Sequence, residues 1–387
     1  MRWRSAYTRS GVASVGGVKA KGADLQNRRR AIGPRATTYR PGPARNARAA
    51  GYHLTRVYDP SAMSIDPRIA RAFEADNGFP LEPHLIVLAL MGSHSHGTYM
   101  PPEEPDAIDD VDLMGFVVPP LRYHLGLPRW EHWRLQADEL DVVIYSLEKA
   151  VRLLLKSNPN IVGLLWLREN EYVHRHAMFD LLHARRAIFS SQAAADSFAG
   201  YAYDQLKRME AFDLDRMAEY EALTKEIRVR GPMTEVLEAD KAKLEHIARN
   251  WSVPLETLNR FRKLHHEHFS GYMGEKRKAM VRKYQYDVKN AAHLIRLLRM
   301  GIEFLETGQL QVFRTSDADE LKVIKRGGWT LDQVKEQAEQ LFGRIEEARA
   351  RSPLPPRPDE AAANALIMDM HLRVLDLTNG AEGQGLA

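Results

Sequence analysis

The chain has 387 residues, 44% of them hydrophobic and 27% charged, which is typical of a soluble globular protein with room for two domains. The absence of cysteine excludes disulfides, thiol nucleophiles and cysteine-ligated zinc, and it favours a reducing, cytoplasmic location. The formal charge is +4, but residues 1–50 contribute +11, which leaves −7 for the other 337 residues. A nucleic-acid-binding body is therefore not indicated by charge, and no apolar run is long enough to span a membrane.

Residues 1–62 are rich in Arg, Gly, Ala and Ser and have no sustained apolar periodicity, so they are predicted to be a disordered basic extension. Such a segment could be a nucleic-acid arm or an arginine-rich organelle-targeting segment. The favoured interpretation is an upstream extension, with Met63 as an alternative start.

Residues 63–192 alternate between helical and strand patterns and are predicted to form one domain. A short helix is expected over 67–76, capped by Ser64 or Asp66. The continuous apolar run 85–90 is typical of a central strand covered on both faces. Further strands are expected over 113–118 and 140–145, and Ser146 is expected to cap the helix that follows.

Residues 193–357 show long helical patterns and are predicted to form an all-helical domain. The only strand expected here is residues 310–313, and residues 358–387 are expected to form a C-terminal helix and tail. The helices are predicted at residues 195–222, 234–249, 255–269, 276–307 and 331–350. The predicted fold class is thus α+β, with a mixed sheet and helices followed by a helical domain.

Three aspartates are the strongest candidates for chemistry. Asp110 and Asp112 are two residues apart, so on an extended segment their side chains project to one face. Asp141 opens another predicted strand and completes a cluster of three carboxylates if the two strands are neighbours. Oxygen-only ligands with room for phosphates suit Mg²⁺ or Mn²⁺, and two such ions can promote attack on a phosphate and departure of pyrophosphate.

The turn before these aspartates could hold phosphates. Gly92 allows the backbone to leave the first strand in a conformation that other residues avoid, and Ser93 adds a hydroxyl. Gly97 and Thr98 repeat both features. A triphosphate would then lie between backbone donors on one side and metal-bridged aspartates on the other.

Other candidates have two interpretations each. Lys289, His293 and Arg296 share one helix face, which is either a solvated stripe or a basic wall facing phosphates. His94 and His96 are more simply loop residues than transition-metal ligands.

These motifs resemble those of the DNA polymerase β superfamily of nucleotidyltransferases, in which a Gly-Ser turn is followed by Asp-x-Asp and a third Asp. Further blocks are similar to the RNA-ligase-associated (YcgL-like) subgroup over about residues 85–358. They are Lys156–Asn160 with Leu164–Trp166, the run from Tyr286 to Leu298, the run from Glu303 to Leu310, and Ser352–Pro355.

The resemblance implies a polymerase-β-like fold and a metal-dependent transfer of NMP from an NTP to an acceptor hydroxyl, with an RNA end in a repair reaction as the associated acceptor. It places Mg²⁺ or Mn²⁺ on Asp110, Asp112 and Asp141. It places the nucleotide on Gly92, Ser93, Gly97, Thr98, Lys289, His293 and Arg296. The alternative is an antitoxin-like or protein-nucleotidylating module that acts on a protein partner.

Two features depart from the subgroup. The spacer between Gly97 and Asp110 is long and holds Pro101, Pro102 and Pro105, so it is a candidate lid over the nucleotide. Asn290 stands where many relatives have histidine.

Overall fold

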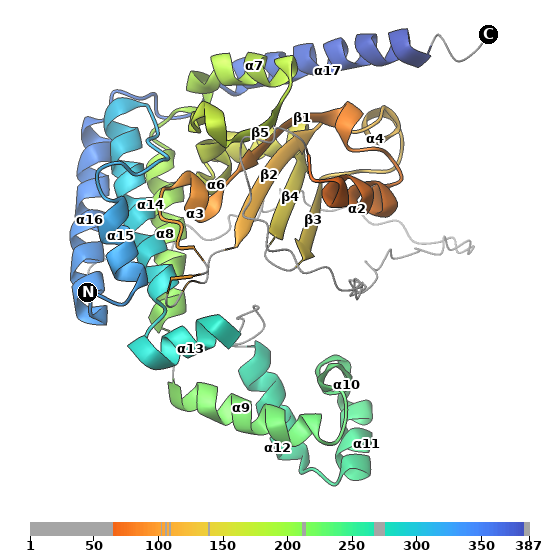
Figure 1. The fold of residues 1–387 in the computed structure, drawn as a ribbon, viewed down its shortest axis with the longest axis vertical. Coiled ribbons are helices and arrows are strands. Elements are labelled where there is room, and N and C mark those ends of the chain that lie inside the picture. Colours follow the sequence, from red (N-terminus) through yellow and green to blue (C-terminus); the bar gives the residue numbers. More distant parts are fainter. Residues whose placement is uncertain are drawn as a thin grey trace, which may run out of the picture. The chain divides into compact units, whose positions relative to one another are not determined.

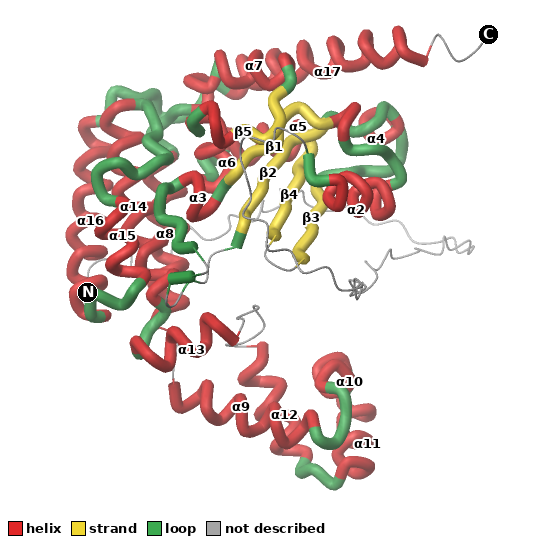
Figure 2. The backbone as a smooth tube through the Cα atoms, in the orientation of Figure 1, coloured by secondary structure: helices red, strands yellow, loops and turns green. Residues whose placement is uncertain are grey.

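Five strands form one mixed sheet in the order β3-β4-β2-β1-β5 (Figure 2). The computed structural model describes residues 65–101, 103–104, 107, 110–137, 140–210, 214–266 and 275–382. β2 and β4 pair in parallel, and the other neighbours pair antiparallel. The strands are β1 Leu85–Leu90, β2 Val111–Val117, β3 His132–Ala137, β4 Leu140–Ser146 and β5 Tyr172–Arg175. This sheet confirms the predicted α+β class.

The predicted central strand is confirmed. All six residues of β1 are buried, because β2 and β5 flank the strand and other elements cover both faces. β3 and β5 were not predicted from the sequence. β3 lies on the edge of the sheet with Trp133 as its one buried residue, and β5 has only four residues.

The helices around the sheet begin at the expected caps. Helix α2, Pro67–Asn77, is capped by Asp66, whose side chain accepts a hydrogen bond from the Arg68 amide. Helix α5, Leu147–Leu155, is capped by Ser146, which accepts from the Lys149 amide. The shorter helices of this part are η1 Glu82–His84, α3 Gly92–Ser95, α4 Arg122–Leu125, α6 Pro159–Val162, η2 Gly163–Trp166, η3 Glu169–Glu171, α7 Ala177–Ala184 and η4 Arg186–Phe189.

The rest of the described chain is helical, as predicted. α14 packs against α8, α15 and α16 (Figure 1). α17 packs against α5, α7 and η4. The helices are α8 Ala194–Glu210, α9 Leu214–Arg228, α10 Met233–Glu238, α11 Lys241–Trp251, α12 Leu255–Leu264, α13 Glu275–Tyr284, α14 Val288–Thr307, α15 Ala318–Lys325, α16 Leu331–Arg351 and α17 Glu360–Glu382. No helix in the described part of the chain is both long and apolar enough to cross a membrane.

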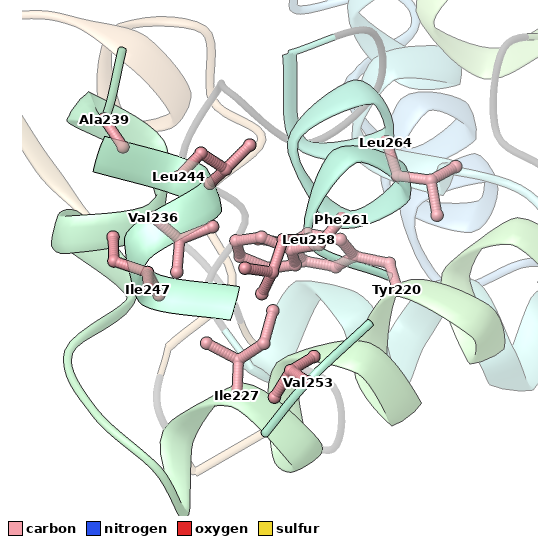
Figure 3. Packing of buried hydrophobic residues seen from close by; sticks show 10 residues of the cluster. All are labelled: Tyr220, Ile227, Val236, Ala239, Leu244, Ile247, Val253, Leu258, Phe261 and Leu264. Atoms are coloured by element: carbon pink, nitrogen blue, oxygen red, sulfur yellow. The ribbon is translucent and has the colours of Figure 1, made fainter. Parts of the chain in front are cut away.

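Helices α9 to α12 enclose a small hydrophobic core of their own (Figure 3). The Tyr220 and Phe261 rings stack at its centre with ring centroids 5.3 Å apart. The other buried members are Ile227, Val236, Ala239, Leu244, Ile247, Val253, Leu258 and Leu264.

Several predicted helix boundaries were wrong. The helix expected over 276–307 is two helices, because Gln285 has a left-handed backbone (φ 66°) and the Asp287 side chain caps α14 through the Asn290 amide. The expected helix over 234–249 is likewise split into α10 and α11. Within the range 195–222 the structure describes α8 up to Glu210 and α9 from Leu214. Residues 310–313 are not a strand. Leu310 and Val312 are buried, which explains the strand-like pattern.

Residues 1–62, which are predicted to be disordered, lie outside the part of the chain that the structure describes. The chain from Pro60 onward packs as one compact unit. The proposed division into domains at 63–192, 193–357 and 358–387 stays a prediction.

Candidate active site

One cavity of about 510 Å³ lies between the sheet and the helical part of the chain. The strand side contributes carboxylates and the Gly-Ser turn, whereas α14 and α15 contribute basic side chains. The polar or turn-forming residues that line it are Gly92, Ser93, His96, Thr98, Asp112, Arg134, Asp141, Tyr145, Asn158, Tyr201, Lys289, His293, Arg296 and Lys325. Most of the residues predicted from the sequence therefore come together here.

The Gly-Ser turn interlocks with the strand that bears Asp112. Gly92 has a left-handed backbone (φ 62°), and a Cβ atom there would lie 1.8 Å from Asp112 Oδ2. The Met91 amide donates to the Asp112 carbonyl over 2.8 Å, which joins the end of β1 to the start of β2. Only glycine permits both the backbone angle and the close approach of the carboxylate.

A Gly92→Ala variant should therefore bind nucleoside triphosphate poorly. The added methyl group would displace the Asp112 carboxylate and strain the turn, and we expect a loss of stability of about 1–3 kcal/mol. Thermal unfolding and a triphosphate-binding titration would measure the two effects. Gly343→Ala is the matched control: position 343 lies in α16 with open space around it, so stability should stay the same or rise. Wild-type triphosphate binding by Gly92→Ala would contradict this account.

Gly97 and Thr98 are anchored by residues from far along the chain. Gly97 also has a left-handed backbone (φ 69°), and a Cβ atom there would lie 2.8 Å from the Phe313 ring. The Thr98 carbonyl accepts a hydrogen bond from the buried Lys325 Nζ at 2.8 Å. Thr98 lines the cavity, whereas Gly97 is not among its lining residues.

The carboxylates are arranged less symmetrically than predicted. Asp112 and Asp141 are direct partners in the parallel β2–β4 ladder, and both line the cavity. Asp110 comes just before β2, is exposed and does not line the cavity. Arg134 on β3 holds Asp141 in a two-pronged ion pair, with 2.9 Å from Arg134 Nε to Asp141 Oδ1.

The three predicted metal-binding aspartates do not form a tight cluster. Among the described residues, one group of three His, Asp or Glu side chains has ligand atoms that all lie within 4.8 Å of one another, and it is elsewhere in the fold. Asp141 also forms an ion pair with Arg134. The metal-binding role of the aspartates stays a prediction.

The predicted basic face of α14 borders the cavity. Lys289, His293 and Arg296 all line it. Burial lowers the pKa of Arg296 to about 9, and the nearby Arg314 adds to this effect. Within the described residues, the hydrogen bond of the Arg296 side chain goes to Met300 Sδ rather than to a carboxylate. Arg296 is thus a cation that an anionic ligand would stabilise.

Two histidines near this face are held neutral. Burial lowers the pKa of His96 well below its usual range, with Arg296 and His293 adding to the effect. Burial, Arg296 and Arg277 likewise lower the pKa of His293. The two loop histidines of the Gly-Ser turn have other contacts. His96 Nδ1 lies 3.2 Å from the Val312 carbonyl, and the His94 ring stacks on the Tyr99 ring. Neither His94 nor His96 therefore points to a transition-metal site with the aspartates.

Some residues of the cavity were missed by the sequence interpretation. Arg134 was missed because β3 was not predicted, and Lys325 because α15 was not predicted. Asn158, which lies in one of the blocks similar to the subgroup, lines the cavity and donates to the Tyr201 hydroxyl at 2.5 Å. Tyr145 offered a signal, because it lies in phase with Asp141 and Val143 on β4.

The two departures from the subgroup have structural roles. Asn290 is buried, and its side-chain carbonyl accepts a hydrogen bond from Arg277 at 2.6 Å. In the spacer after Gly97, Glu104 forms an ion pair with Arg326. Asp109 and residues 102, 105, 106 and 108 lie outside the described part, so the lid stays a prediction.

Trp130 and Trp133 pack rather than line the cavity. Their indole N–H groups donate to Asn77 Oδ1 and Asp76 Oδ2, at 2.7 and 2.9 Å. Both rings contact Phe73 edge-on.

Comparison with known families gives one match. The model of a family described as the RNA repair pathway DNA polymerase beta family matches residues 69–226. This segment contains the whole sheet, the Gly-Ser turn and all three aspartates. A search among curated proteins found no match.

Proposed function

Over residues 69–226 the chain belongs to the RNA repair pathway DNA polymerase beta family, and on that premise we propose that it transfers NMP from an NTP to a hydroxyl group of an RNA end. The observation that carries the proposal is the cavity with carboxylates on one wall and a partly buried basic face on the other. That division of charge suits a triphosphate whose metal-bound side faces the aspartates.

The residues of the strand wall fit a magnesium or manganese ion. Asp112 and Asp141 offer hard carboxylate oxygens from adjacent strands, and Gly92 leaves room for the Asp112 carboxylate next to the turn. Asp110, one residue before β2, is the further predicted ligand. The ion would supply charge neutralisation for the triphosphate and for the departing pyrophosphate.

The chain's own residues would bind and orient the reactants. Gly92 and Ser93 would hold the phosphates at the end of β1, and Lys289 and Arg296 would hold them from α14. Asp141, fixed by Arg134, would orient the acceptor hydroxyl and accept its proton. The acceptor oxygen then forms a bond to the α-phosphorus, the bond to the bridging oxygen breaks, and pyrophosphate leaves.

An end-labelling assay tests this function. The full chain would be incubated with each of the four labelled NTPs, Mg²⁺ or Mn²⁺, and RNAs of defined ends. We expect label on RNA and one pyrophosphate released per nucleotide added. Label on no RNA would contradict the RNA acceptor, and intact-mass measurement of co-expressed proteins would then show whether a protein is modified instead.

Arg296→Met should have opposite effects on stability and on nucleotide binding. The change removes a partly buried cation that lacks a hydrogen-bonded carboxylate, so the melting temperature without ligand should stay the same or rise. It also removes a charge-assisted contact to phosphate, so NTP affinity should fall about tenfold or more.

Arg299→Met is the matched control on the same helix. Arg299 pairs with Asp317 and Glu320, so its replacement should lower the melting temperature and leave NTP affinity near wild type. An Arg296→Met protein with wild-type NTP affinity would remove this residue from the phosphate site. Isothermal titration and thermal unfolding measure both quantities.

A further inference from the structure

Three side chains outside the cavity meet near the middle of the C-terminal helix α17. They are His124 of α4, Glu148 of α5 and His371 of α17, and their ligand atoms all lie within 4.8 Å of one another. His124 Nδ1 is 2.6 Å from Glu148 Oε1, and His371 Nε2 is 3.0 Å from the same oxygen. All three side chains are largely buried, with exposed fractions of 16%, 28% and 18%.

The outer nitrogen of each imidazole faces a backbone carbonyl. His124 Nε2 is 2.8 Å from the Pro119 carbonyl, and His371 Nδ1 is 2.7 Å from the Ile367 carbonyl. A carbonyl oxygen only accepts hydrogen bonds, so each of these outer nitrogens has the proton. In a neutral imidazole the inner nitrogen then presents a lone pair.

When both imidazoles are neutral, two lone pairs point at one carboxylate oxygen. His371 Nε2 is buried and makes no hydrogen bond among the described residues, although it lies 3.0 Å from Glu148. Three electron-pair donors at this spacing repel one another unless a positive charge lies between them. Arg129 does not supply it, because its guanidinium donates to the carbonyls of Tyr123 and His124.

The donor set and its support are those of a metal site. Two imidazole nitrogens and one carboxylate oxygen suit Zn²⁺ and similar dications. Metal-binding histidines typically donate their other N–H to a carbonyl or carboxylate, as both do here. Tetrahedral ligation by zinc spaces ligand atoms about 3.3 Å apart, so both histidine nitrogens, now 2.6 and 3.0 Å from Glu148 Oε1, would move away from that oxygen by less than an ångström.

We propose that His124, Glu148 and His371 bind one zinc-like dication, which fastens α17 to α5 and to the segment that follows β2. None of the three residues lines the cavity, so the site is structural and separate from the proposed transfer reaction. The helix it would hold packs against α5, α7 and η4, and Figure 1 shows it beside α7.

Zinc binding to the full chain tests the proposal. Untagged protein would be treated with chelator and titrated with ZnCl₂ in excess Mg²⁺, which occupies carboxylate sites elsewhere. We expect one bound zinc per chain, a rise of several degrees in melting temperature, and at least tenfold slower amide hydrogen exchange in residues 360–374.

Variants separate this site from other zinc-binding groups. Glu148→Gln and His371→Ala should each lose the bound zinc and the slowed exchange, whereas His246→Ala, on the exposed face of α11, should keep both. Asp112→Asn should also keep both. A zinc-induced shift that persists in His371→Ala, or disappears in Asp112→Asn, would overturn the assignment. Equal protection of the α17 amides from hydrogen exchange in chelator and in zinc, measured on the wild-type protein, would also overturn the assignment. Protonated histidines would then be what holds the three side chains together.

Discussion

Replacing Asp112 by asparagine should abolish nucleotidyl transfer while the fold stays intact. Asp112 is the carboxylate that both lines the cavity and lies against Gly92. Asparagine keeps the shape but removes the negative charge needed to bind a divalent cation. A loss of several kcal/mol of transition-state stabilisation corresponds to a reduction of the transfer rate by about a thousandfold or more.

The fold should tolerate this change because asparagine keeps the backbone contact that joins residue 112 to the end of β1. The Asp112 carbonyl accepts from the Met91 amide, and the side chain is not needed for that bond. Transfer of labelled NMP and the melting temperature would be measured together. Asp319→Asn, an exposed position in the first turn of α15, is the matched control and should be fully active. Substantial transfer by Asp112→Asn would refute the proposed site.

The Asp141→Asn variant should differ from Asp112→Asn in its effect on NTP binding. Asp141 is already neutralised by Arg134, so the variant frees an arginine next to the nucleotide. If Asp141 orients the acceptor, the turnover number should fall while NTP affinity is kept or improved.

The largest expected effect on stability comes from Arg314. Its guanidinium is 1% exposed and forms ion pairs with Glu303 and Asp317. Removing one partner of a buried ion pair typically costs about 3–5 kcal/mol, because the other charges are left without compensation. Glu303 is 32% exposed and Asp317 keeps its bond to Arg299, so we expect Arg314→Met to lose about 3 kcal/mol, measured by urea unfolding.

The acid sensitivity of unfolding should change as well. Burial would raise the pKa of Asp317, but hydrogen bonds from Arg314 and Arg299 more than offset it and lower the pKa below its usual value. A lowered carboxyl pKa stabilises the fold at neutral pH, and this stability is lost as the pH falls through the folded-state value. In Arg314→Met the folded-state pKa of Asp317 should lie closer to its unfolded value, so this acid-induced loss should be smaller and complete at a higher pH. Arg351→Met, which breaks an exposed pair with Glu347, should leave unfolding unchanged. An Arg314→Met protein as stable as the wild type would contradict the structural role of this arginine.

Local patterns were sufficient to predict the centre of the fold. Six consecutive apolar residues predicted β1. The positions of Gly92 and Asp112 predicted a glycine turn near a carboxylate, which the structure shows, whereas the binding of phosphate there stays a prediction. β3 was missed since an edge strand with an exposed polar face has the composition of a loop.

The contacts that the sequence could not predict are those that depend on tertiary structure. The pairing of Arg134 with Asp141 requires the β3–β4 register, in which position 136 lies opposite Asp141. The bond from Lys325 to Thr98 joins positions 227 residues apart. No periodicity in the sequence specifies such a pairing. The surroundings of Arg296 are also beyond the sequence. Only the three-dimensional structure shows that, among the described residues, its side chain is hydrogen-bonded to Met300 Sδ and not to a carboxylate.

The distance in sequence between the two halves of the cavity has a consequence for protein synthesis. His96 is bonded to the segment at Val312, and Lys325 to Thr98, yet the sheet and its aspartates are translated more than a hundred residues earlier. Domains form progressively as the chain emerges, and contacts between distant positions are made late. A ribosome-bound chain would therefore have a finished sheet but no complete cavity until α15 has emerged, so the proposed transfer reaction would have to wait for the end of synthesis.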